Sequence, residues 1–537
     1  MRCVFWVALS IRGGGIDSPR PASQRAAALV LTAALLTGAA FPAFADTYYI
    51  ENGDITISAG ESGNDVTQNN VTTKNDTDTI ITNSDKATAS SHTVTIDAGN
   101  DKVEVTLKDV NIDTSSRNKA AVSVTGSGNT TIKLDGDNAL KSDTSRSGIY
   151  GSGSLTISGG ENDSLTAQGG SGANGISSSG SLTISGGTVT ANGDDGGRGI
   201  SSSGRVTISG GSTVTAKGGS GTISGGDGIC SSGGVTISGG STVTANGGNG
   251  GRLVGGDGIR SSGGVTISGG STVTANGGNG GSIGGGSGIY SNGSLTISGG
   301  TVNANGGSGK NGNGGNGIIG SGRVAISGGT VNAAGGDGTN SNGGEGIYGR
   351  KGIDLSGSLE LTAKAGSPNG KALSQDGKEL DLDTINKDKL DPGAKVTTTD
   401  ADGKVIKQVS IPRPVEPEKP VIPEESSSSS DGGSSAPSAS VSSLPGLTVT
   451  DKSGAVISYT STQSGNTLTV CVGRLTASLH VSLAALRQLR AEGIETITFQ
   501  TILCSTTLSV DELLAMGGED AEAVLTHRLT DSSLTVG

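Results

Sequence analysis

A Gly-Ile pair recurs eight times through the middle of the chain. Its isoleucines are separated by 27, 24, 29, 30, 30, 29 and 29 residues, and they are Ile149, Ile176, Ile200, Ile229, Ile259, Ile289, Ile318 and Ile347. Repeats of this length are typical of solenoids, in which one unit buries its apolar side only by stacking on its neighbours. The repeat therefore argues against a conventional layered domain in this region.

Each unit holds two further apolar positions at nearly constant spacing. Eight residues after every isoleucine stands a second branched apolar residue, and a third follows five, six or eight residues later. In the stretch VTISGGSTVTA the apolar residues alternate with Thr or Ser, which is the period of a strand with one buried face. The Gly-Gly step permits a sharp turn. The pattern predicts an all-β protein with a parallel β-helix of three short strands per coil.

The positions outside the strict repeat agree with this fold. No Pro lies between Pro42 and Pro368, as expected where nearly every backbone N–H donates to a neighbouring strand. Residues 54–136 keep the alternation without the strict period, so we expect them to form less regular coils that also cover the open end. Residues 225–250 and 255–280 differ only at Cys230 against Arg260, so this position is expected to face outward.

The first 45 residues have the features of an export signal. Arg25 is followed by the apolar run 26–40, and Ala43 and Ala45 supply the small residues that precede a cleavage site. The run is too short to span a bilayer comfortably. We expect cleavage before Asp46, a secreted or cell-surface protein, and no membrane-spanning segment after cleavage. The long stretch before the run leaves a later translation start open.

Charge restricts the classes of partner. Without residues 1–45 the chain has 33 Lys and Arg against 48 Asp and Glu, a formal charge of −15. This excess argues against nucleic acid, whose binding depends on neutralisation of phosphates by Lys and Arg. An anionic polymer is also repelled unless a cation lies between it and the protein.

The last part of the chain has a different composition. We assign 46–395 to the β-helix and 396–446 to a linker, since five Pro within twelve residues precede a serine tract there. Residues 447–537 predict a small α+β domain of unknown function. TLTVCVG and IETITFQT have the pattern of strands, while SLAALRQLRAEG and SVDELLAMGG have that of helices, the second with a capping-box spacing at Ser509 and Glu512.

Cysteines add one open question. Cys471 and Cys504 share this C-terminal region and pair in an oxidising exterior, or else remain two buried free thiols.

Catalytic residues are scarce in the repeats. The regular coils contain no His, and their charged residues are scattered through the loops, where solvated side chains are the ordinary explanation. A β-helix fold does not by itself confer enzymatic activity. We therefore expect a protein that is not an enzyme.

The residue before each Gly-Ile pair offers a candidate metal site. If the units stack in register, Asp227 and Asp257 lie one coil apart, and their oxygens can share a calcium ion with loop carbonyls. The alternative is a column of turn residues in which Asp and Asn accept hydrogen bonds from the backbone.

The residue after each Gly-Ile pair offers candidate ligand contacts. This position holds Tyr150, Tyr290 and Tyr348, interrupted by smaller or charged residues. An exposed tyrosine can stack its aromatic face on a sugar ring. Thr pairs around Val, such as Thr242 and Thr244, form a second outward pattern that resembles the flat faces of some ice-binding solenoids. Their plain explanation is that Thr forms strands well on a solvated face.

Two stretches carry a family resemblance: residues 105–143, and the SGIYGSGSLTISGG pattern that begins at Ser147. Over about residues 54–365 the chain resembles the secreted carbohydrate-binding β-helix family of Gram-positive anaerobes. The resemblance implies a non-catalytic β-helix that binds an acidic polysaccharide such as polygalacturonate together with calcium. With a charge of −15, such binding is expected to need a bridging divalent cation.

The competing hypothesis is a structural or adhesive surface protein. In that case the β-helix holds the C-terminal domain away from the cell, or the reverse, and the domain contacts a cell-wall or protein partner. The Pro- and Ser-rich linker is the feature that favours it.

Overall fold

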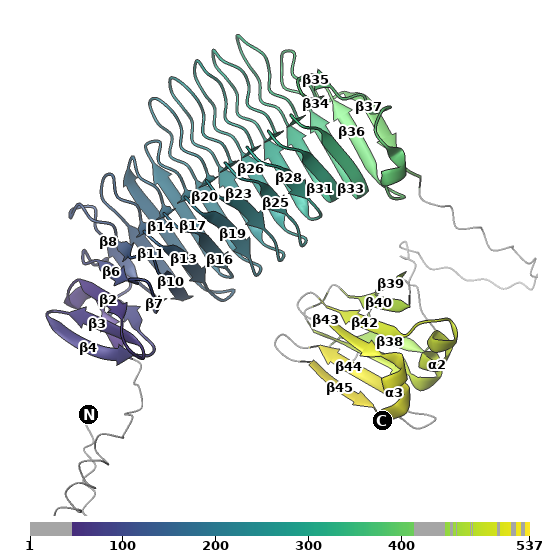
Figure 1. Cartoon of the computed structure of the whole chain (residues 1–537), viewed down its shortest axis with the longest axis horizontal. Coiled ribbons are helices and arrows are strands. Elements are labelled where there is room, and N and C mark those ends of the chain that lie inside the picture. Colours follow the sequence, from purple (N-terminus) through teal and green to yellow (C-terminus); the bar gives the residue numbers. More distant parts are fainter. Residues whose placement is uncertain are drawn as a thin grey trace, which may run out of the picture. The chain divides into compact units, whose positions relative to one another are not determined.

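Figure 1 shows the computed structural model, which describes residues 46–412 and 446–536. The second range has gaps at 452–454, 458, 465, 473, 475, 502–504, 517–521 and 528–531. The predicted export signal and most of the predicted linker lie outside the described residues. The chain divides into two compact units at residues 417 and 418, and each is described by itself.

The first unit is a parallel β-helix with three strands per regular coil (Figure 1). One coil consists of β18 (Ile200–Ser202), β19 (Arg205–Ser209) and β20 (Thr213–Lys217). The first strand of each coil joins a 15-stranded sheet, which we call sheet B, and the other two join a 22-stranded sheet, sheet A. Both the fold and the three strands per coil are as the repeat predicts.

Sheet B pairs in parallel except at its two ends. Its strands are β2 (Ile55–Ala59), β3 (Asn64–Gln68), β4 (Val71–Asp76), β6 (Val94–Asp97), β9 (Val122–Thr125), β12 (Ile149–Gly151), β15 (Ile176–Ser178), β18, β21 (Ile229–Ser231), β24 (Ile259–Ser261), β27 (Ile289–Ser291), β30 (Ile318–Gly320), β32 (Ile347–Gly349), β34 (Leu373–Gln375) and β35 (Lys378–Glu379).

Sheet A is parallel except for its last pair. Its strands are β1 (Thr47–Tyr49), β5 (Ile80–Thr82), β7 (Lys102–Lys108), β8 (Asn111–Asp113), β10 (Asn129–Asp135), β11 (Asp137–Lys141), β13 (Ser154–Ser158), β14 (Ser164–Ser171), β16 (Leu182–Ser185), β17 (Thr188–Asp194), β19, β20, β22 (Gly234–Ile237), β23 (Thr242–Asn246), β25 (Val265–Ile267), β26 (Thr272–Asn276), β28 (Leu295–Ile297), β29 (Thr301–Asn305), β31 (Val324–Ala334), β33 (Ile353–Lys364), β36 (Lys395–Thr399) and β37 (Val405–Ser410).

Stacked apolar columns form the core. Ile149 pairs with Ile176, and Ile176 with Ile200, so the Gly-Ile isoleucines lie directly above one another. They are fully buried, as are Ile208 and Val214 of sheet A in the same coil as Ile200. Each buried Ile or Val stabilises the fold by about 2 kcal/mol relative to an exposed one. Because a single coil cannot bury these residues, stability depends on coils stacking in register.

Antiparallel strands close both ends of the β-helix. At the start, β2, β3 and β4 form consecutive antiparallel pairs, so the early segment covers the open end as expected (Figure 1). At the other end β36 pairs in parallel with β33, and β37 folds back on β36. The predicted boundary at residue 395 is therefore too early. Val396 stacks on Leu361 and is buried, so the β-helix continues to Ser410.

The Gly-rich loops stack as regularly as the strands, as the long parallel loops in Figure 1 show. Gly248 N donates to Gly226 O, Gly256 N to Gly248 O and Gly278 N to Gly256 O, at 2.8–2.9 Å. We call this run of backbone hydrogen bonds the glycine stack. A Cβ at Gly278 would lie 2.0 Å from Gly248 O, so no other residue fits there without displacing the backbone.

The second unit confirms the predicted C-terminal elements. One sheet has the order β38 (Leu447–Thr450), β41 (Ala477–Ser482), β44 (Glu522–His527) and β45 (Ser532–Val536); the other has β39 (Thr460–Ser464), β40 (Thr467–Cys471), β42 (Thr496–Gln500) and β43 (Ser505–Ser509). The helices are α2 (Leu483–Ala491) and α3 (Val510–Met516). Ser482 caps α2 by accepting from Ala485 N, and Ser509 accepts from Glu512 N as the capping-box spacing predicts.

Two further predictions concern the cysteine pair of this unit and membrane-spanning segments. Cys504 lies outside the described residues, so the predicted pairing with Cys471 falls outside them too. Among the described helices, none combines the length and the apolar character needed to cross a bilayer.

Candidate functional site

The outer face of sheet B carries the predicted ligand contacts. The residue after each Gly-Ile isoleucine points outward, and strand register places these residues in one line, which we call the sheet B column. The column consists of Ser123, Tyr150, Ser177, Ser201, Cys230, Arg260, Tyr290, Ile319 and Tyr348. The three predicted tyrosines therefore share one face, although they are not adjacent.

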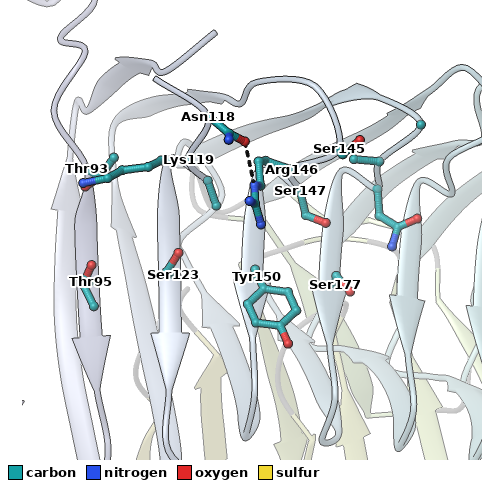
Figure 2. A pocket seen from close by; sticks show the side chains of 14 residues that line it. Thr93, Thr95, Asn118, Lys119, Ser123, Ser145, Arg146, Ser147, Tyr150 and Ser177 are labelled. Carbon is teal, nitrogen blue, oxygen red and sulfur yellow. Dashed lines mark hydrogen bonds between the residues drawn. The ribbon is translucent and has the colours of Figure 1, made fainter. Parts of the chain in front are cut away.

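A groove with a volume of about 770 Å³ opens over Tyr150. Figure 2 shows its floor, where Thr95, Ser123, Tyr150 and Ser177 lie side by side on successive strands. Tyr150 is 43% exposed, so its ring is available to a ligand. The remaining lining comes mainly from the loops before these strands: Thr93, Asn118, Lys119, Ala120, Ser145, Arg146, Ser147, Gly172, Ala173 and Asn174.

Two cations lie at the rim of this groove. Arg146 Nε donates to Asn118 Oδ1 at 3.2 Å (Figure 2). Among the described residues no carboxylate forms a salt bridge with Arg146. Lys119 is half-exposed and its Nζ lies 3.1 Å from Asp54 Oδ2. Both residues stand three positions before a buried strand residue, Ile149 for Arg146 and Val122 for Lys119, and these two residues pair. Register therefore places both cations on neighbouring coils.

Asp54 is surrounded by cations beside the groove. Arg117 donates to both of its oxygens at 2.7 and 3.1 Å, Thr93 N donates to Oδ1 at 2.9 Å, and His92 Nδ1 lies 3.2 Å from Oδ1. Partial burial acts to raise the pKa of Asp54, but the donors from Arg117, Thr93, Lys119 and His92 outweigh it and hold the pKa well below its usual range. One carboxylate thus accepts hydrogen bonds from two cationic side chains, Arg117 and Lys119, beside the groove.

The predicted metal ligands Asp227 and Asp257 lie one coil apart, and both are almost fully buried. Asp227 Oδ1 accepts from Asp257 N at 2.9 Å, and its Oδ2 accepts from Arg198 Nε at 3.1 Å. Asp257 Oδ1 accepts from Ser287 N at 2.6 Å, and its Oδ2 accepts from Arg260 at 2.9 Å. All four oxygens therefore have protein partners.

This arrangement matches the alternative prediction, in which Asp and Asn side chains of one column accept hydrogen bonds from the backbone. The accepted bonds come from the next coil and not from the same turn. Asn174 and Asn316 make the same contact, with Arg198 N at 2.8 Å and Glu345 N at 2.7 Å. Within the described residues, no group of three or more His, Cys, Asp or Glu is placed to hold a metal ion. Burial, and then the charge of Asp227, raise the pKa of Asp257 to about 6.

The column continues beyond the Tyr150 groove. The Arg260 guanidinium lies 4.9 Å from the centroid of the Tyr290 ring, a cation–π contact between adjacent coils. Further along, Tyr348 and Ile319 line a second groove with a volume of about 460 Å³, together with Asn316, Glu345 and Lys371. Both grooves are thus lined by the residue before and the residue after a Gly-Ile pair in two adjacent coils.

The repeat pattern predicts the tyrosines but not the rim cations. Arg146 and Lys119 belong to loops without repeat identity, so no pattern drew attention to them. The signal that could have identified them is their position, since each stands three residues before a buried strand residue, Ile149 or Val122. This match appears only when residues 120–124 (AAVSV) are aligned with the Gly-Ile units.

No family model, curated protein or solved structure matches the chain. Functional interpretation therefore depends on the geometry of this face.

Proposed function

We propose that the protein is a secreted, non-catalytic carbohydrate-binding protein that holds an acidic polysaccharide in the groove over Tyr150. The observation that carries the proposal is the exposed Tyr150 ring on the floor of an open groove whose rim carries Arg146 and Lys119. None of the lining residues is an Asp or Glu, the residue types that most glycoside hydrolases use as acid and base, which supports binding over hydrolysis.

Each part of the groove has a role in binding a uronate sugar. The Tyr150 ring offers a flat apolar face to the C–H groups of a pyranose ring. Hydroxyl and amide groups of Thr95, Ser123, Ser177 and Asn118 can exchange hydrogen bonds with sugar hydroxyls. Arg146 and Lys119 donate charge-assisted hydrogen bonds to a carboxylate, with the planar guanidinium suited to a bidentate contact.

The rim cations also bear on the role of calcium. Without residues 1–45 the overall charge of −15 disfavours an anionic ligand, yet the positive charges of Arg146 and Lys119 lie at the rim of this groove and that of Arg117 lies close by. Direct binding by these side chains is therefore our proposal, with a calcium bridge as the alternative that chelation tests. Binding that survives EDTA supports direct contact, whereas binding lost on EDTA and restored by calcium supports the bridge.

The test is titration of the full-length mature chain with trigalacturonate by calorimetry, against a neutral oligosaccharide of equal length. We expect Tyr150→Ala to weaken trigalacturonate binding about tenfold or more, the scale of a lost aromatic contact. Tyr49→Ala is the matched control, because Tyr49 is also 43% exposed but lies on sheet A. Equal affinity of the Tyr150→Ala variant and the wild type would refute the proposal.

A second candidate function, the structural or adhesive surface protein, is favoured by the separate core of the C-terminal unit. Its prediction is binding to cell walls or to a protein partner that is lost when residues 447–537 are deleted. Retention of that binding in the deletion variant would exclude the candidate.

A further inference from the structure

The Tyr150 and Tyr348 grooves lie on one continuous face. Both open over the sheet B column, and seven successive parallel pairings connect β12, which carries Tyr150, to β32, which carries Tyr348. With neighbouring strands about 4.8 Å apart, the two rings are separated by roughly 34 Å along the β-helix axis. A short oligosaccharide reaches one groove but not both.

The column between the two grooves holds further groups that suit a polysaccharide. Tyr290 and Arg260 form a stacked pair there, and the guanidinium is about half-exposed while it contacts Asp257. The other two side chains between the grooves are small, Ser201 and Cys230, while Ser177 and Ile319 line the grooves themselves. The sheet B column therefore presents a cation, Arg260, and an aromatic ring, Tyr290, about two thirds of the way from Tyr150 to Tyr348.

The two grooves differ in charge. The Tyr150 groove has Arg146 and Lys119 at its rim and no acidic lining residue, whereas the Tyr348 groove pairs one cation, Lys371, with one acid, Glu345. The second groove is thus close to neutral, and Asn316, Asn342 and Asn369 supply most of its polar groups. Charge recognition is expected at the first groove, and stacking with neutral hydrogen bonds at the second.

We propose that the ligand is a long acidic polysaccharide that lies along the sheet B column, parallel to the β-helix axis, and contacts both grooves at once. This inference rests on the proposed function, since it assigns a second subsite to the same face. Once the chain is held at Tyr150, its downstream segment is presented to Tyr348 at a high effective concentration. Weak contacts at the second groove then add strongly to the affinity for a polymer and nothing to that for an oligomer.

The test compares trigalacturonate with polygalacturonate on the full-length mature chain carrying Tyr150→Ala, Tyr348→Ala or both. We expect Tyr348→Ala to leave trigalacturonate affinity unchanged and to weaken polygalacturonate binding about tenfold or more. We expect Tyr150→Ala to weaken both ligands. Because the second groove is nearly neutral, the loss caused by Tyr348→Ala should be equally large at high and low salt.

The possible results separate the two proposals. Unchanged polygalacturonate affinity in the Tyr348→Ala variant overturns the second subsite while leaving the Tyr150 groove intact. Trigalacturonate binding that is unaffected by Tyr150→Ala overturns the proposed function itself. A Tyr348→Ala variant that loses trigalacturonate affinity as well would contradict the separation of the two subsites, and circular dichroism checks that each variant remains folded.

Discussion

The outer faces of the two sheets follow different rules although the same coils build both. On sheet A one outward position is Thr in seven successive coils: Thr131, Thr156, Thr183, Thr207, Thr236, Thr266 and Thr296. On sheet B the outward position varies among the coils and includes Tyr, Ser, Cys, Arg and Ile. Even residues 225–250 and 255–280, otherwise identical, differ at this position alone, Cys230 against Arg260.

The difference separates the requirements of folding from those of recognition. Thr is favourable on a solvated strand, and a uniform column repeats the same favourable neighbour contact in every coil. The grooves over Tyr150 and Tyr348 depend on side chains that occur at only a few coils, which a varied column can supply and a uniform one cannot. The uniform positions are therefore expected to control stability, and the sheet B column to control binding.

The largest effect is expected in the most uniform part of the molecule, the glycine stack. Gly278→Ala places a methyl group 2.0 Å from Gly248 O and should lower the free energy of unfolding by about 3 kcal/mol or more. Denaturant titration measures the change. The control is Gly328→Ala, whose Cβ would meet nothing closer than 3.8 Å, so a shift well below 1 kcal/mol is expected. Equal shifts in both variants would contradict the close packing of the stack.

A smaller effect concerns Asp257 at the margin of sheet B. Its pKa is raised to about 6, above the roughly 3.9 of an unfolded Asp, so the folded state binds more protons between these values. Stability should therefore fall by about 2 to 3 kcal/mol as pH rises from 4 to 6, and then stay level with respect to this group. In Asp257→Asn this dependence should be missing.

Comparison of the wild type with Asp257→Asn isolates the contribution of the Asp257 carboxyl group. Asp54, whose pKa is lowered, acts below pH 4, and Glu345, whose pKa burial raises, titrates equally in both proteins. The measurement is the difference in unfolding free energy between wild type and Asp257→Asn at several pH values. Parallel curves from pH 4 to 6 would show that Asp257 is ionised throughout.

The sequence predicts the stacked core and the strand register well, but it does not predict the groove on sheet B. The stacking of Ile149, Ile176 and Ile200 and the outward direction of Tyr150 follow from the repeat, because a fixed offset survives any loop length. The groove does not follow, because Arg146 and Asn118 come from irregular loops that meet only when coils stack. Register likewise brought Asp227 and Asp257 together as predicted, but no sequence pattern shows that Arg198 and Arg260 occupy their outer oxygens.

Arginines on the two faces give a matched pair for binding. Arg146→Gln removes a rim cation and should weaken trigalacturonate binding about tenfold at low salt, with a smaller loss at high salt where charges are screened. Arg205→Gln removes an arginine of sheet A, whose guanidinium donates to Thr236, and should leave affinity unchanged. Calorimetry at two salt concentrations measures both. Equal losses in the two variants would mean that overall charge, and not the groove, governs binding.

The smallest effects are expected from exchanging the single difference between the two matching coils. Cys230→Arg should change stability by less than about 0.5 kcal/mol, because the position is partly exposed and the next coil, otherwise identical in sequence, accepts Arg260 there. Arg260→Cys should cost more, about 1 kcal/mol, since the buried Asp257 loses a partner for Oδ2 and Tyr290 loses its cation. Thermal denaturation compares the two variants. If this asymmetry is absent, the contacts of Arg260 with Asp257 and Tyr290 do not contribute to stability.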